Sequence, residues 1–277
     1  MIKGISYWAF PAGTDCKTAI KLAKELNYSS IELAFAPADE LGLDTTKEHC
    51  EMLKAYAEEV GIKISSLCSG MYWGESLTDS DPAVAAKAIE NTKKYLEVAS
   101  WIGVDSVLVI PGSVATLDPS VAPIDYELCY AKATEAIKTL IPFAEKAGVC
   151  MALENVWNKF LLSPKEMKDF IDQFDSPFVG SYFDVGNCML NGFPEQWIKC
   201  LGKRIKKVHF KDFKMSVPTL DGFVELLAGD VDWKTTLAAF DAIGYDGFVT
   251  AEMFPYEKAP MLMVTNTSNA MDVILGK

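Results

Sequence analysis

VCMALENVW, residues 149–157, decides the fold class, because a continuous apolar run ends there in a carboxylate, Glu154. An apolar run without polar alternation is typical of a strand that is buried on both faces, as in a parallel sheet. Three later segments repeat the pattern: FVGSYFDVGN (178–187), IKKVHFKDF (205–213) and GFVTAEMF (247–254). The sequence therefore predicts four parallel strands, each with a metal-binding type of side chain at or near its C-terminal end.

Four further apolar runs precede these segments, and helical patterns separate all eight. The additional strand candidates are residues 3–10, 30–35, 63–70 and 106–112. Apolar residues at i, i+3, i+4 and i+7 predict helices over residues 16–27, 47–61, 83–103, 126–148, 163–174, 195–202, 233–244 and 265–276. Ser163 and Glu166 form a helix-start signal around Pro164, and a glycine closes a helix just before the next strand at Gly61, Gly103, Gly148 and Gly244. Eight strand–helix units in about 250 residues predict an α/β fold, a (β/α)8 TIM barrel.

No linker or composition shift divides the chain, so residues 1–277 are predicted to form one domain, a single TIM barrel. The competing architecture is a doubly wound open sheet. That fold normally carries a glycine-rich phosphate turn after its first strand, and here the residues after WAF (8–10) read PAGTD. The barrel also makes neighbours of the four strands that carry the polar side chains.

The charge balance restricts the partners of this chain. With 26 Lys and Arg against 38 Asp and Glu, the formal net charge is −12, which is the wrong sign for a nucleic-acid partner. The seven cysteines contain no CxxC pair and are expected to be reduced thiols in a cytoplasmic protein. No apolar run approaches the roughly 18 residues that span a bilayer, so no membrane partner is expected. Whether the chain forms a homo-oligomer is left open.

The four polar residues at the strand ends are Glu154, Asp184, His209 and Glu252. A single Asp or Glu after a strand often caps the next helix instead. All three carboxylates, however, lie in apolar surroundings on adjacent strands, where unpaired charges are costly and a bound cation removes their repulsion. Three carboxylates and one imidazole suit Mn²⁺, Mg²⁺ or Co²⁺, and we expect one such ion per chain. This ion would hold a ketone and its neighbouring hydroxyl and make the adjacent proton acidic.

These segments resemble the sugar isomerase and epimerase group of xylose isomerase-like TIM barrels, which includes the D-tagatose and D-psicose 3-epimerases. The resemblance covers essentially the whole chain. Its strongest elements are LEN (153–155), YFDVGN (182–187), VHFKD (208–212), TAE (250–252) and GDVDW (229–233). It implies that the four residues named above bind one divalent metal, and that Glu154 and Glu252 are the catalytic pair on opposite faces of the substrate's C3.

The resemblance implies an epimerase or isomerase of a ketose or ketose derivative that works through a cis-enediolate. One glutamate removes the proton next to the carbonyl, and the other returns a proton to the opposite face. A ketose–aldose isomerisation uses the same groups on one face, so the reaction class is better defined than the product. A sugar-phosphate isomerase, or a lyase, dehydratase or deglycosidase acting on a 3-keto-sugar with the same metal site, is the alternative.

Two departures from the epimerase pattern bear on the substrate. A histidine expected three positions after Asp184 is replaced by Asn187, and an arginine expected after His209 is absent, which leaves Lys211 and Lys214 as the nearby cations. A lysine there suits a sugar phosphate, but a solvated surface lysine is the commoner outcome, and the acidic chain favours an unphosphorylated substrate. The predicted substrate-binding residues are Asn187, Lys211, Trp157, Asn155, Asn158, Trp73 and Glu32.

Two other functions are weighed against this one. An abasic-site endonuclease of the same superfamily needs many histidines and a basic groove, and this chain has two histidines and a negative charge. A barrel that only binds sugar predicts a broken set of metal ligands, whereas this set is complete. The sequence therefore favours a sugar-converting enzyme with a small-molecule carbohydrate as its partner.

Overall fold

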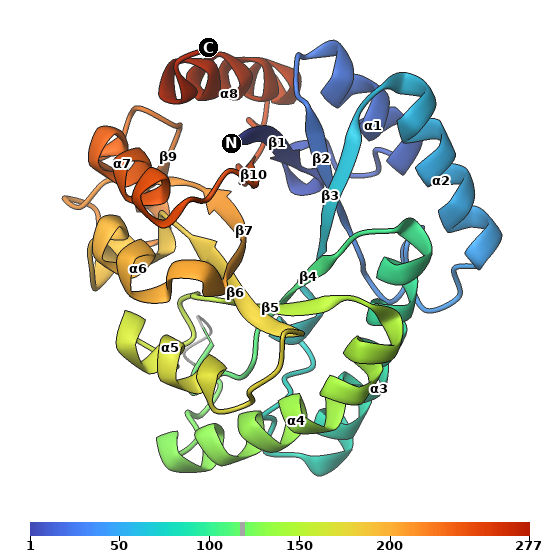
Figure 1. The fold of residues 1–277 in the computed structure, drawn as a ribbon, viewed down its shortest axis with the longest axis vertical. Coiled ribbons are helices and arrows are strands. Elements are labelled where there is room, and N and C mark those ends of the chain that lie inside the picture. Colours follow the sequence, from blue (N-terminus) through green and yellow to red (C-terminus); the bar gives the residue numbers. More distant parts are fainter. Residues whose placement is uncertain (117–119) are drawn as a thin grey trace.

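Eight parallel strands close into a barrel in the computed structural model, which describes residues 1–116 and 120–277 (Figure 1). The order around the barrel is β1-β10-β7-β6-β5-β4-β3-β2, so the last barrel strand pairs with the first. The strands are β1 (Ile2–Ser6), β2 (Ser30–Ala34), β3 (Lys63–Cys68), β4 (Ser106–Val109), β5 (Cys150–Glu154), β6 (Val179–Asp184), β7 (Ile205–Phe210) and β10 (Phe248–Ala251). The closed barrel confirms the predicted fold class and excludes the open sheet.

Eight α-helices surround the barrel among the described residues (Figure 1). They are α1 (Cys16–Glu25), α2 (Lys47–Val60), α3 (Pro82–Ile102), α4 (Tyr126–Ala147), α5 (Pro164–Asp172), α6 (Pro194–Leu201), α7 (Trp233–Ile243) and α8 (Pro260–Leu275). Short 3-10 helices lie at Tyr7–Ala9, Met71–Trp73, Asn187–Leu190, Gly202–Arg204 and Leu220–Gly222. Helix α8 begins five residues before the predicted residue 265, because Pro260 fits the first helical position, where no backbone N–H is needed.

The helix ends follow the predicted signals. The Ser163 side chain accepts a hydrogen bond from the backbone of Glu166 (3.2 Å), and each of the four predicted glycines adopts the left-handed conformation just after its helix. Among the described residues, no helix is both long enough and apolar enough to cross a membrane.

A small antiparallel hairpin, which the sequence did not predict, follows the seventh barrel strand. It pairs β8 (Asp212–Phe213) with β9 (Phe223–Val224). The buried carboxylate of Asp212 accepts hydrogen bonds from the backbone N–H groups of Phe213, Leu227 and Val231 and from the indole of Trp233. One side chain therefore fixes the whole segment between β7 and α7, including the GDVDW stretch.

Candidate metal centre

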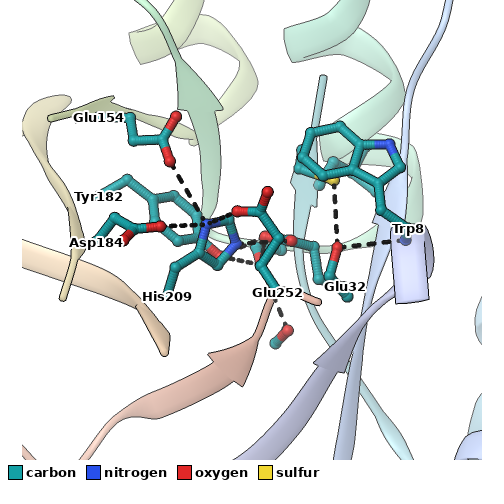
Figure 2. A network of polar contacts seen from close by, with 12 residues as sticks. Trp8, Glu32, Glu154, Tyr182, Asp184, His209 and Glu252 are labelled. Atoms are coloured by element: carbon teal, nitrogen blue, oxygen red, sulfur yellow. Dashed lines mark hydrogen bonds and ion pairs between the residues drawn. The ribbon is translucent and has the colours of Figure 1, made fainter. Parts of the chain in front are cut away.

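The four predicted ligands meet at the C-terminal end of the barrel (Figure 2). Glu154 and Asp184 are the last residues of β5 and β6, His209 lies on β7 opposite Asp184, and Glu252 directly follows β10. One ligand atom from each residue can be chosen so that all four lie within 4.8 Å of one another. Three of the residues are buried, and only 11% of the Glu252 side chain is exposed. Parallel strand ends gather on one face of a barrel, which is why four distant segments converge here.

The imidazole of His209 has a different partner on each of its two nitrogens. Its Nδ1 faces the carboxylates, 2.7 Å from Glu252 Oε2, 3.6 Å from Glu154 Oε1 and 3.8 Å from Asp184 Oδ2. Its Nε2 lies 2.9 Å from Glu32 Oε1, on the opposite side of the ring (Figure 2). A metal-binding histidine commonly donates its second ring N–H to a carboxylate, which fixes the ring's orientation. The observed arrangement leaves Nδ1 as the ligand atom.

Glu32, on β2, lies behind the histidine and has no exposed surface. Besides His209, its carboxylate accepts hydrogen bonds from Ser66 (3.0 Å) and from the hydroxyl of Tyr182, whose ring packs 4.4 Å from the imidazole. Burial raises the pKa of Glu32, but the attraction of His209 outweighs it and lowers the pKa overall. The structure thus places Glu32 against the histidine, where it has no surface left for the substrate contact that the sequence predicted.

Three buried atoms at the centre of the cluster test whether a metal ion fits. Asp184 Oδ2, His209 Nδ1 and Glu252 Oε2 make no hydrogen bond of normal geometry among the described residues, and their contacts are ion pairs with one another and with the ammonium of Lys211. Buried polar atoms without partners are rare because each costs free energy. Three such atoms that converge, from hard oxygen and imidazole donors, fit a divalent cation. The residues present therefore suit the ion that the sequence predicts.

Asp184 also contacts the start of the following 3-10 helix, although Gly186 and not Asp184 is the N-cap of that helix. Its Oδ1 accepts a hydrogen bond from the backbone of Asn187 (2.7 Å), while its Oδ2 faces the cluster. Asn155 holds the backbone of Asp184 from both sides, donating to its carbonyl (2.8 Å) and accepting from its N–H (2.9 Å). The two asparagines thus fix the position of this carboxylate.

The two glutamates differ strongly in electrostatic environment. Burial, partly offset by His209 and Lys211, raises the pKa of Glu154 to about 7 in the metal-free chain. Burial also raises the pKa of Glu252, but the cations of Lys211 and His209 outweigh it and lower the pKa to about 2. Carboxyl groups whose pKa values are pushed apart in this way are typical of an acid and base pair.

Lys211 is buried, which corrects the expectation of a solvated surface lysine. Its Nζ lies 3.1 Å from Asp184 Oδ2 and 3.0 Å from Glu252 Oε2, and 10% of its side chain is exposed. Burial lowers the pKa of Lys211, but the surrounding carboxylates raise it well above its usual value. Gly186 makes room for this lysine, since a Cβ there would lie 2.5 Å from Lys211 Cβ. Lys214, by contrast, is exposed as expected.

A cavity of about 230 Å³ opens in front of the two glutamates. Aromatic side chains form much of its wall: Trp8, Trp73, Trp157, Phe223 and Phe254. Asn187 and Lys211 also line it, and Asn187 Nδ2 lies 3.4 Å from Glu154 Oε1. These positions suit the predicted contacts of Trp73, Trp157, Asn187 and Lys211 with a substrate.

Asn158, also predicted to contact substrate, is buried away from this cavity. Its side chain donates to the carbonyl of Gly112 (2.7 Å) and accepts from the backbone of Phe160 (3.0 Å). It therefore holds the loop after β5. Phe223, Tyr182 and Ser66 were missed by sequence reasoning. Tyr182 had a usable signal, because it precedes Asp184 by two residues and so points to the same face of the strand.

Comparison with known proteins agrees with the fold. The xylose isomerase-like TIM barrel family matches residues 20–270, and the chain belongs to this family. L-Ribulose-5-phosphate 3-epimerase UlaE from Salmonella paratyphi C (strain RKS4594) is 25% identical over 263 residues, covering 91% of this chain and 86% of that protein. Such relatives support the assignment of this chain to the sugar isomerase and epimerase enzymes.

Two solved structures share the fold. A D-psicose 3-epimerase crystallised in the presence of D-fructose has a TM-score of 0.83 and 19% identity, with 100% of both chains covered. The IolI protein with a bound zinc atom has a TM-score of 0.78 and 18% identity, with 100% of this chain and 98% of that chain covered.

Proposed function

We propose that this protein is a metal-dependent epimerase or isomerase of a ketose or ketose derivative. The observation that carries the proposal is the pairing of Glu154 and Glu252, two carboxyl groups of opposite pKa shift, in one cluster of ligand atoms that faces a cavity. Family membership and the names of the curated relatives support the reaction class. The four residues Glu154, Asp184, His209 and Glu252 would hold one divalent ion.

The reaction needs one group to remove a proton and another to return one. In our proposal the Glu252 carboxylate, which its low pKa keeps ionised, takes the proton from the carbon next to the carbonyl. The C–H electron pair forms the C=C bond of a cis-enediolate, and the carbonyl π pair moves onto oxygen. Glu154, once it has taken a proton from solvent or from a substrate hydroxyl, protonates the same carbon from the other face. The roles exchange in the reverse direction.

The ion, for which Mn²⁺, Mg²⁺ and Co²⁺ are the candidates, would supply electrostatic stabilisation for the carbonyl and hydroxyl oxygens. Asn187 and Lys211 would orient the substrate oxygens, and the aromatic wall would keep water from the enediolate. We also place the protein in the cytoplasm, since all seven cysteines are free thiols, six of them buried.

The proposal is tested with a panel of ketoses, ketose phosphates and 3-keto-glycosides. Each is incubated with chelated protein and with the same protein reloaded with Mn²⁺ or Co²⁺, and the products are identified by NMR. We expect an epimer or an aldose isomer from at least one substrate, only after reloading. Equal turnover by fully chelated protein would show that the metal requirement is wrong.

A further inference from the structure

The cavity in front of the glutamates holds little positive charge. Among the described residues that line it, Lys211 is the single cation, whereas Glu154 and Glu252 are carboxylates. The ammonium of Lys211 already lies within 3.1 Å of two carboxylate oxygens, from Asp184 and Glu252. Lys211 and a divalent ion together carry three positive charges, whereas the three carboxylate ligands and the buried carboxylate of Glu32, 2.9 Å behind His209, carry up to four negative charges. No surplus charge remains for a phosphate dianion, which needs charge-assisted partners when it leaves water.

In the loop after β7, one of the two loops that form the usual phosphate position of a TIM barrel, backbone N–H groups already donate within the protein. Phosphates often bind backbone N–H groups of the loops after the seventh and eighth strands. In the loop after β7, the carboxylate of Asp212 accepts from three such groups and from one indole N–H. The carboxylate of Asp230 accepts a hydrogen bond from the backbone N–H of Met215 (2.8 Å), and the carbonyl of Gly222 accepts one from the backbone N–H of Lys214 (2.7 Å). These N–H groups of the loop are therefore already satisfied by acceptors of the protein and are not free to bind a phosphate.

The remaining wall suits an uncharged molecule. Five aromatic side chains and several aliphatic ones surround the cavity beyond the carboxylates. Trp157 packs against Phe213 and Phe223, with ring centroids 5.3 and 5.0 Å away, so its indole is held in place. Rigid aromatic faces pack well against the C–H surface of a sugar, but they offer a dianion neither positive charge nor a hydrogen-bond donor.

A second cavity, of about 360 Å³, lies on the other side of this wall. The two cavities share Val156, Trp157 and Asn187, and the indole N–H of Trp157 donates to the Asn187 carbonyl (3.0 Å). The second cavity has an exposed cation, Lys159, on its lining. Lys159 is absent from the lining of the cavity that contains Glu154 and Glu252.

We infer that the substrate is an unphosphorylated ketose or keto-sugar, packed by its C–H surface against the aromatic wall, and that the matching phosphate ester is disfavoured. This inference rests on the proposed function for the reaction, but it concerns binding and can be tested separately. It differs from what the name of the curated relative UlaE says of that protein, which is called an L-ribulose-5-phosphate 3-epimerase.

The experiment compares matched pairs: L-ribulose with L-ribulose 5-phosphate, and D-fructose with D-fructose 6-phosphate. Binding is measured by saturation-transfer NMR on Mg²⁺-loaded protein, and kcat/KM is measured on Mn²⁺-loaded protein. Both are repeated in Lys211→Met and Lys159→Ala. In at least one pair we expect the ketose to bind and to have a kcat/KM about tenfold or more above that of its ester, since the ester must bury an uncompensated charge. The ratio should stay within about threefold in Lys159→Ala, because that lysine does not line the cavity, and should stay the same or rise in Lys211→Met, because the loss of the single cation on the lining makes a dianion less favourable still.

The outcomes separate the two proposals. A preference for the ester, above all one that disappears in Lys211→Met or Lys159→Ala, would overturn the inference while leaving the epimerase proposal intact. Binding of neither member of either pair would also overturn it. A ketose that binds better than its ester but is never converted would support the inference and count against the proposed function.

Discussion

Replacing Glu32 by glutamine removes one negative charge from behind His209 while keeping the size of the side chain. The Glu32 carboxylate is fully buried, lies 2.9 Å from the histidine Nε2 and also accepts hydrogen bonds from Ser66 and Tyr182. A glutamine oxygen can still accept from the imidazole, so the ring stays in place. What is lost is the charge that makes Nδ1 a stronger ligand and holds the ring in one tautomer.

The magnitude follows from the kind of contact. A hydrogen bond to a charged group contributes about 1.5–3 kcal/mol, and each 1.4 kcal/mol is a factor of ten in affinity. Removing the partner of a metal-binding histidine typically weakens metal affinity by about 10- to 100-fold. We therefore expect Glu32→Gln to bind Mn²⁺ or Co²⁺ about 10- to 100-fold more weakly than the parent protein does. Saturating metal should restore part of its kcat.

The assay is a metal titration in which calorimetry measures the metal affinity, with circular dichroism to confirm that each variant is folded. Ser66→Ala is the matched control, since it removes one neutral donor to the same carboxylate (3.0 Å) and should change metal affinity far less. Parent-like affinity in a folded Glu32→Gln variant would refute the idea that Glu32 tunes the histidine.

Three further predictions concern the loop and the protonation of the site. Asp212→Ala should lower the free energy of unfolding in urea by about 3 kcal/mol or more, because four donors lose their acceptor, while Asp230→Ala on the exposed part of the same loop should have a small effect. Gly229→Ala should lower the melting temperature as well, since its Cβ would lie 2.1 Å from Asp212 Oδ1. Gly74→Ala is the control and should be tolerated, because the atom nearest to its Cβ would be 3.9 Å away. Equal melting temperatures for these two variants would contradict the prediction. Metal affinity should fall steadily as the pH is lowered through 7, by about tenfold per pH unit or more, because the metal must displace the proton of Glu154, whose pKa burial raises to about 7, and that of His209, whose pKa is lowered by burial but raised well above its usual value by the neighbouring carboxylates; titrations that give one affinity from pH 5.5 to 8 would contradict this linkage.

The sequence was sufficient for the barrel because each strand is a continuous apolar run with a helix after it. It was also sufficient to bring Glu154, Asp184, His209 and Glu252 together, since parallel strand ends share one face. Nothing in the local pattern pairs Glu32 with a histidine 177 positions away. That contact depends on how β2 and β7 face each other across the barrel interior, which periodicity does not encode.

Lys211 and Asn158 show a second limit of sequence reasoning. Lysine is rarely buried, so a surface position was the better expectation, and only the three surrounding carboxylates make burial of Lys211 favourable. Asn158 lies beside the predicted site in sequence, but its hydrogen bonds go to the backbone of Gly112 and Phe160. In both cases the deciding partners come from other segments of the chain.

The central claim is that Glu154 and Glu252 transfer a proton at the carbon next to a ketose carbonyl while a divalent ion occupies the cluster. The most direct measurement is the incorporation of solvent deuterium at C3 of a converted ketose, followed by NMR in Mn²⁺-loaded parent, Glu154→Gln and Glu252→Gln proteins with metal content measured in each. We expect exchange in the parent, none after chelation, and rates about 10² to 10⁴ lower in either variant that retains metal. Exchange at the parent rate in a metal-retaining variant, or in chelated parent, would contradict the account.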